Sequence, residues 1–316
     1  MDKTLIVITG PTGVGKTAAA IQLAQRLHCD IINADSRQIY RGIPICTAAP
    51  TPEELAAAPH HFVAFKDLEE SYSAAQFESD VMALLPSLWQ QGDYAVMCGG
   101  SMLYIDAVCR GIDNLPDISP EVRAAVKEKL ASEGLESLVA ELEQLDPQYA
   151  ATIDRKNTSR VCHGVEICRQ AGVPYSTLRT GTAKQRDFNI IKLALNIERD
   201  QLFDRINRRV DRMIEAGLEQ EARSVYHLRH LNALNTVGMK EMFAIFDGTM
   251  DWHTAIERMK KNTRVYAKKQ LTWYRRDPDI TWCRPEEAVT TALAQLTIVM
   301  PMAGVMRVSP KKDSMI

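Results

Sequence analysis

Three features are missing from this sequence of 316 residues, and each absence excludes a class of protein. No uninterrupted apolar stretch reaches the ~20 residues that a membrane-spanning helix needs. The first residues lead directly into a short apolar strand, without the pattern of a secretory signal peptide. The chain also lacks an excess of basic residues, because its formal net charge is −2. We therefore expect a cytoplasmic protein without membrane contact, in which any nucleic-acid-binding surface is local.

The cysteine pattern provides no disulfide framework. The cysteines are scattered, odd in number, and without a CxxC pair. This pattern is typical of reduced thiols, mostly buried as small core residues, in a cytosolic protein. The cysteines are Cys29, Cys46, Cys98, Cys109, Cys162, Cys168 and Cys283.

Short apolar runs alternate with helical patterns in the first third of the chain, which predicts a parallel β-sheet with helices on both faces. Strands are expected at 5–8, 31–32, 62–65, 94–98, 190–195 and 280–282. Helices are expected at 18–27, 73–90, 120–172, 200–229 and 252–274. Gly134 and Asp146-Pro147 should interrupt the helical region 120–172.

These elements predict an α/β core with an all-helical insertion. Residues 1–114 should form the first part of the core and 115–187 the insertion. Residues 188–300 should complete the core, and 301–316 should form a C-terminal tail that is mostly polar from Ser309 onward.

A phosphate-binding loop follows the first expected strand. Residues 10–17, GPTGVGKT, match the full GxxxxGK[ST] pattern between a strand and a helix. Glycines let backbone N–H groups curl around phosphate oxygens, and the helix N-terminus adds partial positive charge. Lys16 supplies a mobile cation, and the Thr17 hydroxyl is a ligand for Mg²⁺. The motif predicts a polyphosphate site without specifying the polyphosphate. Its residues are Gly10, Pro11, Thr12, Gly13, Val14, Gly15, Lys16 and Thr17.

The aspartate typical of ATP- and GTP-hydrolysing enzymes is missing. In those enzymes a strand ends in an aspartate that supports Mg²⁺, but the expected strand 94–98 ends in Gly99-Gly100-Ser101. Asp35 follows the second expected strand instead, where a parallel sheet presents its ligand-binding edge. A carboxylate there can act as a base towards an acceptor held beside the phosphates. Helix capping is its alternative or additional role.

Two expected helices carry clustered positive charge. Segments of this kind can follow an RNA backbone, or they can be solvated faces with acidic neighbours. Both interpretations stay open. The basic residues of the first helix are Arg205, Arg208, Arg209 and Arg212, and those of the second are Lys261, Arg264, Lys268 and Arg275.

Several motifs, in order along the chain, resemble those of the bacterial tRNA dimethylallyltransferases, also called tRNA isopentenyltransferases. The resemblance extends from Leu5 to about Trp282. It is carried by 10–17, by DSRQIY at 35–40, TA at 47–48, PHH at 59–61, GGSMLY at 99–104, Arg205-Ile206 with Arg209, VG at 237–238, and QLTW at 270–273.

This resemblance implies a reaction. Dimethylallyl diphosphate transfers its prenyl group to the exocyclic N6 amine of the adenosine 3′-adjacent to the tRNA anticodon, and diphosphate leaves. The loop 10–17 then holds the diphosphate of the prenyl donor rather than ATP, which accounts for the missing hydrolytic aspartate. Mg²⁺ is the implied cofactor, and the anticodon stem-loop is the implied macromolecular partner. We expect no obligate protein partner, and a monomer is the default.

The resemblance also implies roles for individual residues. Asp35 is the expected base. Lys16, Mg²⁺ on Thr17, and Arg209 would stabilise the charge that develops on the leaving diphosphate. Arg205 and Arg209 match the two arginines of the family's RxxxR pattern, and Thr12 is placed to touch a phosphate oxygen.

The implied tRNA contacts lie in several segments. Ser101 fills a Thr or Ser position at a channel that joins donor and acceptor, and Arg123 corresponds to a second position on the tRNA side. The insertion would grip the stem-loop while the target base flips out of its stack. The remaining expected contacts are Asp35, Ser36, Arg37, Gln38, Ser159, Arg160, Val161, Cys162, His163, Asn235, Thr236, Val237, Gly238, Met239, Lys240, Lys261, Arg264 and Lys268.

Two residues depart from the family pattern, and three other functions compete. His163 stands where an arginine is frequent, and Met239 replaces the usual aromatic residue. A P-loop small-molecule kinase would use Asp35 but leaves the basic helices and the insertion unexplained. A nucleotide-regulated RNA-binding switch gives Asp35 no role. Prenylation of free AMP or ATP is less favoured, because the insertion points to a macromolecular acceptor.

Overall fold

The computed structural model describes residues 3–113 and 115–299, so the expected tail 301–316 lies outside the described residues. The chain divides into two compact units. One unit combines the chain up to Cys109 with the chain from Arg186 onward, and the other is Arg110–Gln185. None of the helices within the described residues is both long enough and apolar enough to span a membrane.

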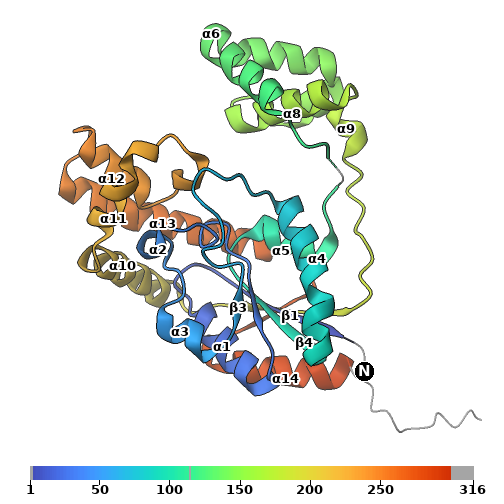
Figure 1. Ribbon diagram of the computed structural model, residues 1–316, viewed down its shortest axis with the longest axis vertical. Coiled ribbons are helices and arrows are strands. Elements are labelled where there is room, and N and C mark those ends of the chain that lie inside the picture. The colour runs from blue at the N-terminus through green and yellow to red at the C-terminus, as the bar shows by residue number, and fades with distance from the viewer. Residues whose placement is uncertain (1–2, 114, 300–316) are drawn as a thin grey trace, which may run out of the picture. The chain divides into compact units, whose positions relative to one another are not determined.

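The first unit is built on a six-stranded sheet with the order β3-β2-β4-β1-β5-β6, and every neighbouring pair is parallel (Figure 1). Parallel order follows from the helices that connect successive strands. The predicted α/β fold, with a parallel sheet flanked by helices, is therefore confirmed. The strands are β1 (Thr4–Thr9), β2 (Ile31–Asn33), β3 (His60–His61), β4 (Tyr94–Cys98), β5 (Asn189–Leu195) and β6 (Ile280–Cys283).

Helices cover both faces of this sheet, because side chains alternate along each strand. Ile6 and Ile8 of β1 pack with α1 and α14 on one face. Leu5 and Val7 pack with α4 and α5 on the other face. The helices around the sheet are α1 (Lys16–Leu27), α3 (Pro52–Ala57), α4 (Ala74–Gln91), α5 (Met102–Arg110) and α14 (Ala288–Val299).

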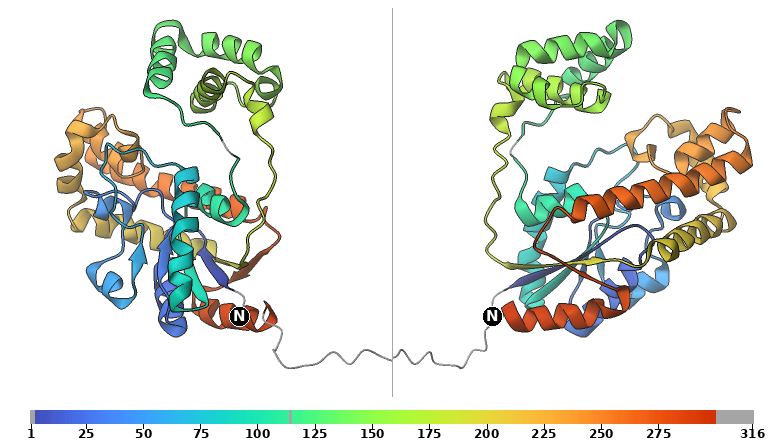
Figure 2. Two further views of the ribbon diagram at one scale, coloured as in Figure 1. Left: turned by 45° about the vertical axis from the view of Figure 1, so that its right-hand side comes forward. Right: turned by 180° about the vertical axis from the view of Figure 1, so that it is seen from behind.

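A second cluster of helices in the same unit has its own apolar core. Buried side chains of α10, α11, α12 and α13 meet there, together with Cys46 of α2. Figure 2 shows α13 running beside α10 in the rear view. The members are α2 (Pro44–Thr47), α10 (Arg199–Glu215), α11 (Leu218–Val225), η1 (Tyr226–Leu228), η2 (Asn232–Leu234), α12 (Met239–Phe246) and α13 (Trp252–Tyr274), and η3 (Pro285–Glu287) precedes α14.

One long helix over 200–229 was expected, and this prediction is wrong. The chain leaves the helix after Glu215, because Gly217 adopts a φ of 99°. This left-handed conformation favours glycine and ends a helix. The arginines of α10 therefore belong to a separate, shorter helix.

The second unit is wholly helical among its regular elements. The breaks predicted at Gly134 and Asp146 are confirmed: Gly134 has a φ of 82°, and Asp146 accepts hydrogen bonds from Tyr149 N at 2.9 Å and Ser176 N at 2.6 Å. A further break between Thr152 and Thr158 was not expected. The helices are α6 (Pro120–Leu145), α7 (Pro147–Thr152), α8 (Thr158–Ala171) and α9 (Tyr175–Leu178).

The strand expected at 62–65 is absent from this segment, because pairing with β2 involves only His60 and His61. Phe62 and Ala64 have φ angles of 62° and 47°. A β-strand requires negative φ angles, so the extended backbone stops at His61. The N–H of Ala64 instead donates to Gln38 O at 2.9 Å.

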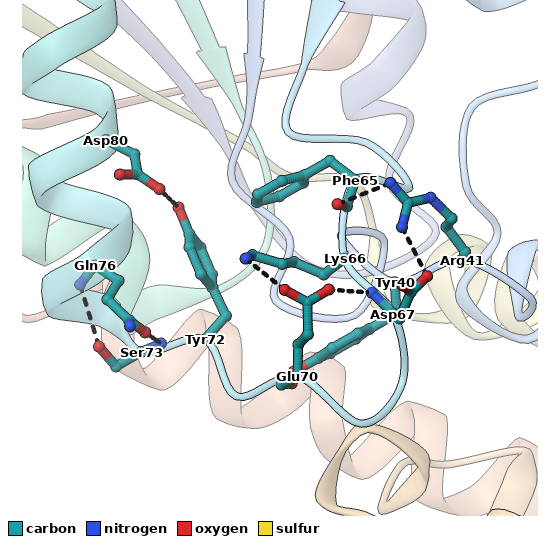
Figure 3. Close-up of polar contacts among 10 residues, drawn as sticks. All are labelled: Tyr40, Arg41, Phe65, Lys66, Asp67, Glu70, Tyr72, Ser73, Gln76 and Asp80. Atoms are coloured by element: carbon teal, nitrogen blue, oxygen red, sulfur yellow. Dashed lines mark hydrogen bonds and ion pairs between the residues drawn. The ribbon is translucent and has the colours of Figure 1, made fainter. Parts of the chain in front are cut away.

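Polar contacts hold the loop between β3 and α4 in this non-extended form (Figure 3). Arg41 Nη2 donates to Phe65 O at 3.0 Å, and Lys66 Nζ lies 2.8 Å from Glu70 Oε1. The Tyr72 hydroxyl donates to Asp80 Oδ2 on α4 at 2.6 Å. Contacts to distant residues, rather than the apolar run itself, therefore decide the conformation of this loop.

Candidate active site

Three loops meet at one edge of the sheet, because β1, β2 and β4 are parallel neighbours. The P-loop follows β1, Asp35 follows β2, and Gly99 follows β4. Ala34 N donates to Cys98 O at 2.8 Å, and Gly99 N donates to Ile8 O at 3.2 Å. The carboxyl ends of parallel strands are the usual ligand-binding edge of such a sheet.

Two glycines allow close backbone contacts at this edge, one between the P-loop and the end of β5 and one between the loops after β4 and β2. A Cβ atom on Gly10 would lie 2.5 Å from Leu195 O, and one on Gly99 would lie 2.1 Å from Ala34 O. Both distances are shorter than any ordinary contact to a backbone oxygen, so a side chain at either position would separate the loops. The glycine at 99, where hydrolytic enzymes carry an aspartate, therefore has a packing role here.

The P-loop positions a buried ammonium group. Lys16 Nζ donates to Gly10 O at 3.1 Å and to Pro11 O at 3.0 Å. Burial lowers the pKa of Lys16 to about 8; Cys98 and Asp35 oppose this shift, and the positive charge of Arg209 adds to it. A cation held in this way, with limited access to water, interacts strongly with a phosphate group.

Helix α10 brings two arginines to the P-loop. Arg209 Nη1 donates to Thr12 Oγ1 at 3.4 Å, and Arg205 Nη1 donates to Val14 O at 3.2 Å. Burial lowers the pKa of Arg209, and the negative charge of Asp35 opposes that shift. Arg209 therefore lies in the interior of the site, whereas Arg205 supports the P-loop backbone.

Gln270 of α13 connects the P-loop with the loop after β4. Its Oε1 accepts from Thr12 N at 2.8 Å, and its Nε2 donates to Gly100 O at 2.9 Å. The side chain is 1% exposed. In the sequence, Gln270 stands out only as part of the motif at 270–273, which indicates no separate role for it. No local pattern distinguishes Gln270, because α13 also carries the amide of Asn262.

Asp35 both caps a turn and faces the cavity. Its Oδ1 accepts from Arg37 N at 2.9 Å and from Gln38 N at 3.4 Å. These two N–H groups fix the orientation of the carboxylate. Ser36 N donates to Ser101 Oγ at 2.7 Å, which joins the Asp35 loop to the start of α5.

A cavity of about 340 Å³ is lined by some of these residues. This volume lies within the usual range of small-molecule sites. Thr12, Asp35 and Arg209 line it together with the segment 235–238 and Lys240. The cavity therefore joins a phosphate-binding loop to a carboxylate and to a segment expected to bind RNA.

Comparison with known proteins places this arrangement in a family. The sequence matches the family model described as IPP transferase over residues 38–277. The chain belongs to the IPP transferase family. It is 51% identical to tRNA dimethylallyltransferase 2 of Parabacteroides distasonis, over 93% of this chain and 99% of that protein.

Solved structures agree with this assignment. The tRNA isopentenylpyrophosphate transferase of Bacillus halodurans has a TM-score of 0.67 and 36% identity, covering 94% of this chain and 96% of that one. A eukaryotic dimethylallyltransferase acting on tRNA has a TM-score of 0.78 and 27% identity, covering 94% of this chain and 78% of that one.

In this IPP transferase, two of the expected tRNA contacts are fully buried. Met239 is 0% exposed in the apolar core of the helical cluster, and Val161 is 0% exposed in the core of the second unit. Both side chains pack inside an apolar core, and RNA contact at these two positions stays a prediction. Family position alone suggested these contacts, and the inward-facing positions on α12 and α8 explain their burial.

The other expected contacts are reachable to different degrees. Arg37 Nη1 donates to Asn232 O at 2.7 Å, and Gln38 Nε2 donates to Ala48 O at 2.9 Å, so both side chains hold loops in place. In the second unit Arg123 is exposed, and burial, with the charge of Arg123, lowers the pKa of His163. Ser159 and Arg160 are exposed as well, and Cys162 is half-buried.

The basic residues of α13 do not form one uniform face. Arg264 Nη1 donates to Asn207 Oδ1 on α10 at 2.5 Å and is therefore partly committed to helix packing. Lys268 Nζ lies 5.5 Å from the ring centroid of Phe203 but remains exposed, as does Lys261. RNA binding by these three residues stays a prediction.

Proposed function

We propose that this IPP transferase moves a dimethylallyl group from dimethylallyl diphosphate to the exocyclic N6 amine of the adenosine 3′-adjacent to the tRNA anticodon. The observation that supports this most directly is the single cavity lined by Thr12, Arg209 and Asp35. A diphosphate loop and a carboxylate in one cavity suit a transfer in which one partner loses diphosphate and the other loses a proton. The proposal includes action in the cytoplasm.

The donor diphosphate would lie in the P-loop, against its backbone N–H groups and Lys16. As the bond between C1 of the prenyl group and the bridging oxygen breaks, negative charge grows on the diphosphate. Lys16 and Arg209 would stabilise this charge, which accelerates the step because they already lie in position. The new bond forms between C1 and the N6 nitrogen.

Asp35 would accept the proton that N6 releases. An exocyclic adenine amine is a weak nucleophile, so a base near its proton helps the reaction. The hydrogen bonds from Arg37 N and Gln38 N hold the carboxylate in one orientation.

Mg²⁺ is part of the proposal. Among the described residues, no group of three or more His, Cys, Asp or Glu side chains could hold a metal ion by itself. We therefore propose a cation that is bound mainly by substrate phosphates and water, to which the Thr17 hydroxyl supplies one oxygen. Bound there, Mg²⁺ would neutralise charge on the diphosphate.

The tRNA would reach the cavity through the segment 235–238 and Lys240, together with Ser36 and Ser101. The second unit, with Arg123, Ser159 and Arg160, would grip the anticodon stem-loop. The target base must leave its stack to reach the donor, as enzymes that modify bases generally require.

The deciding experiment is incubation with labelled dimethylallyl diphosphate, Mg²⁺ and unmodified tRNA. AMP and ATP serve as competing acceptors. We expect label in tRNA at the adenosine next to the anticodon, and none in free nucleotides. Robust ATP turnover without prenyl transfer would contradict the proposal and favour a kinase.

A further inference from the structure

The cavity contains one aromatic side chain among the described residues that line it, and neither the mechanism nor the sequence motifs use it. This residue is Tyr266 of α13. Its side chain is 39% exposed, so it does not belong to the apolar core. A partly exposed aromatic ring in the wall of a polar cavity is free to contact a ligand that enters the cavity.

The position of Tyr266 is well defined relative to the P-loop. Tyr266 and Gln270 are four residues apart on α13 and so lie on the same face of the helix. Gln270 is anchored to Thr12 and Gly100. Tyr266 therefore lies one turn, roughly 6 Å along the helix axis, from the contact that holds the P-loop.

The phenol end of Tyr266 lies within the electrostatic field of the expected base. Burial raises the pKa of Tyr266 to about 12; the charge of Asp35 raises it further, and Arg37 opposes the shift. Tyr266 and Asp35 line the same cavity, and part of Tyr266 faces solvent. An acceptor bound beside Asp35 in this cavity could therefore also contact the ring of Tyr266.

We propose that Tyr266 is the stacking platform for the flipped acceptor base. This inference rests on the proposed function. A purine stacked on the ring of Tyr266 would lie inside the cavity, with its exocyclic amine directed towards Asp35. Aromatic rings bind bases in this way because every base has a π-face, and the stacked base loses the freedom to rotate away from the donor.

The test compares Tyr266→Leu with Tyr266→Phe. Stacking on one aromatic ring corresponds to roughly a 5- to 150-fold effect. We expect Tyr266→Leu to lower kcat/KM for tRNA by that factor, mainly through KM, and Tyr266→Phe to restore most of the activity. A loss confined to kcat, with KM unchanged, would overturn the platform and instead indicate that the ring stabilises the reacting prenyl carbon.

A fluorescent base gives a readout that does not depend on turnover. A stem-loop RNA with 2-aminopurine at the target position lacks the reacting amine, so it binds without being modified. Stacking on an aromatic ring quenches this base. We expect a quenched signal with the wild type and Tyr266→Phe, and a bright one with Tyr266→Leu. Equal signals from all three proteins would overturn the inference.

The matched control is Trp252→Leu. Trp252 is an exposed aromatic residue on the same helix, 41% exposed, and 14 residues earlier, or about 21 Å along the axis. The Trp252→Leu substitution should leave the fluorescence and the KM for tRNA unchanged. An effect equal to that of Tyr266→Leu would overturn the assignment. Affinity for dimethylallyl diphosphate, measured by calorimetry, confirms that each variant is folded.

The two proposals fail in different ways. If the wild type transfers no prenyl group to unmodified tRNA, the proposed function is wrong. If the wild type transfers it and Tyr266→Leu matches the wild type in KM and fluorescence, only the stacking platform is wrong.

Discussion

Replacing Lys16 with methionine should remove a pH-dependent destabilisation of the folded protein, together with its affinity for diphosphate. The pKa of Lys16 falls from 10.5 to about 8 on folding. The folded state therefore releases the Lys16 proton more readily than the unfolded state, so the charged group opposes folding at neutral pH. A methionine of similar length removes the charge and keeps the side chain's apolar stem.

The magnitude follows from the shift. At about 1.36 kcal/mol per pKa unit, the full difference corresponds to about 3 kcal/mol at pH 7. Lys16 keeps some contact with solvent, and screening by water reduces the effect to about 2 kcal/mol. Because the folded pKa is the lower one, the penalty is complete below pH 8 and disappears as pH rises towards 10.5. Roughly half of it, about 1 kcal/mol, should be lost between pH 7 and 9.5.

The assay is urea denaturation of wild type and Lys16→Met at pH 7, 8.5 and 9.5. The variant also loses the hydrogen bonds from Nζ to Gly10 O and Pro11 O, which cost about 1 kcal/mol each. That cost changes little with pH, so the pH dependence of the difference isolates the charge. Lys127→Met, at an exposed position on α6, is the control and should differ from wild type by a constant amount. Parallel curves for wild type and Lys16→Met would refute the reasoning.

Other variants test the remaining parts of the site. Asp35→Asn should slow single-turnover transfer by roughly 10²- to 10⁴-fold with tRNA affinity retained; near-normal transfer would leave Asp35 only its capping role. Gln270→Met should break the bridge between Thr12 and Gly100 and lower kcat more than donor affinity, and an unchanged kcat in stopped-flow turnover would argue against that link. Lys268→Ala should make the salt dependence of tRNA binding shallower by about one unit or less, whereas Arg209→Ala should weaken donor binding and spare RNA. Donor affinity from calorimetry and tRNA affinity from filter binding over a salt series distinguish the two variants. If the slope of log affinity against log salt is unchanged in Lys268→Ala, the RNA binds elsewhere, most simply on the second unit.

Local patterns predicted the parts of the fold that depend on neighbouring residues. The apolar runs of β1 and β4 were found within a residue or two, because a buried parallel strand needs a continuous apolar segment. The breaks at Gly134 and Asp146 were found because glycine and Asp-Pro act on their own backbone. The resemblance to tRNA dimethylallyltransferases is confirmed by the match to the IPP transferase family.

The failures have a common cause. Residues 62–65 look like a strand, but hydrogen bonds to residues 38 and 39 hold them in a different conformation. The helix predicted at 200–229 was too long, because the pattern of apolar residues continues past Gly217 into α11. The burial of Met239 and Val161 was likewise not visible in the sequence, because it depends on which side of each helix faces a core.

The phosphate-binding loop, the parallel sheet and the family could be predicted from the sequence, because each depends on contiguous residues or on motifs in a fixed order. The residues that complete the site come together only when distant elements pack. Gln270 binds Thr12 across 258 positions of sequence, and Arg209 meets Thr12 across 197. No local signal reports such contacts, because they exist only once α10 and α13 pack beside the edge of the sheet. That packing also brings Tyr266 into the wall of the cavity. In the sequence this residue is one of several large side chains on a helix, and in the fold it is a candidate contact for the acceptor base.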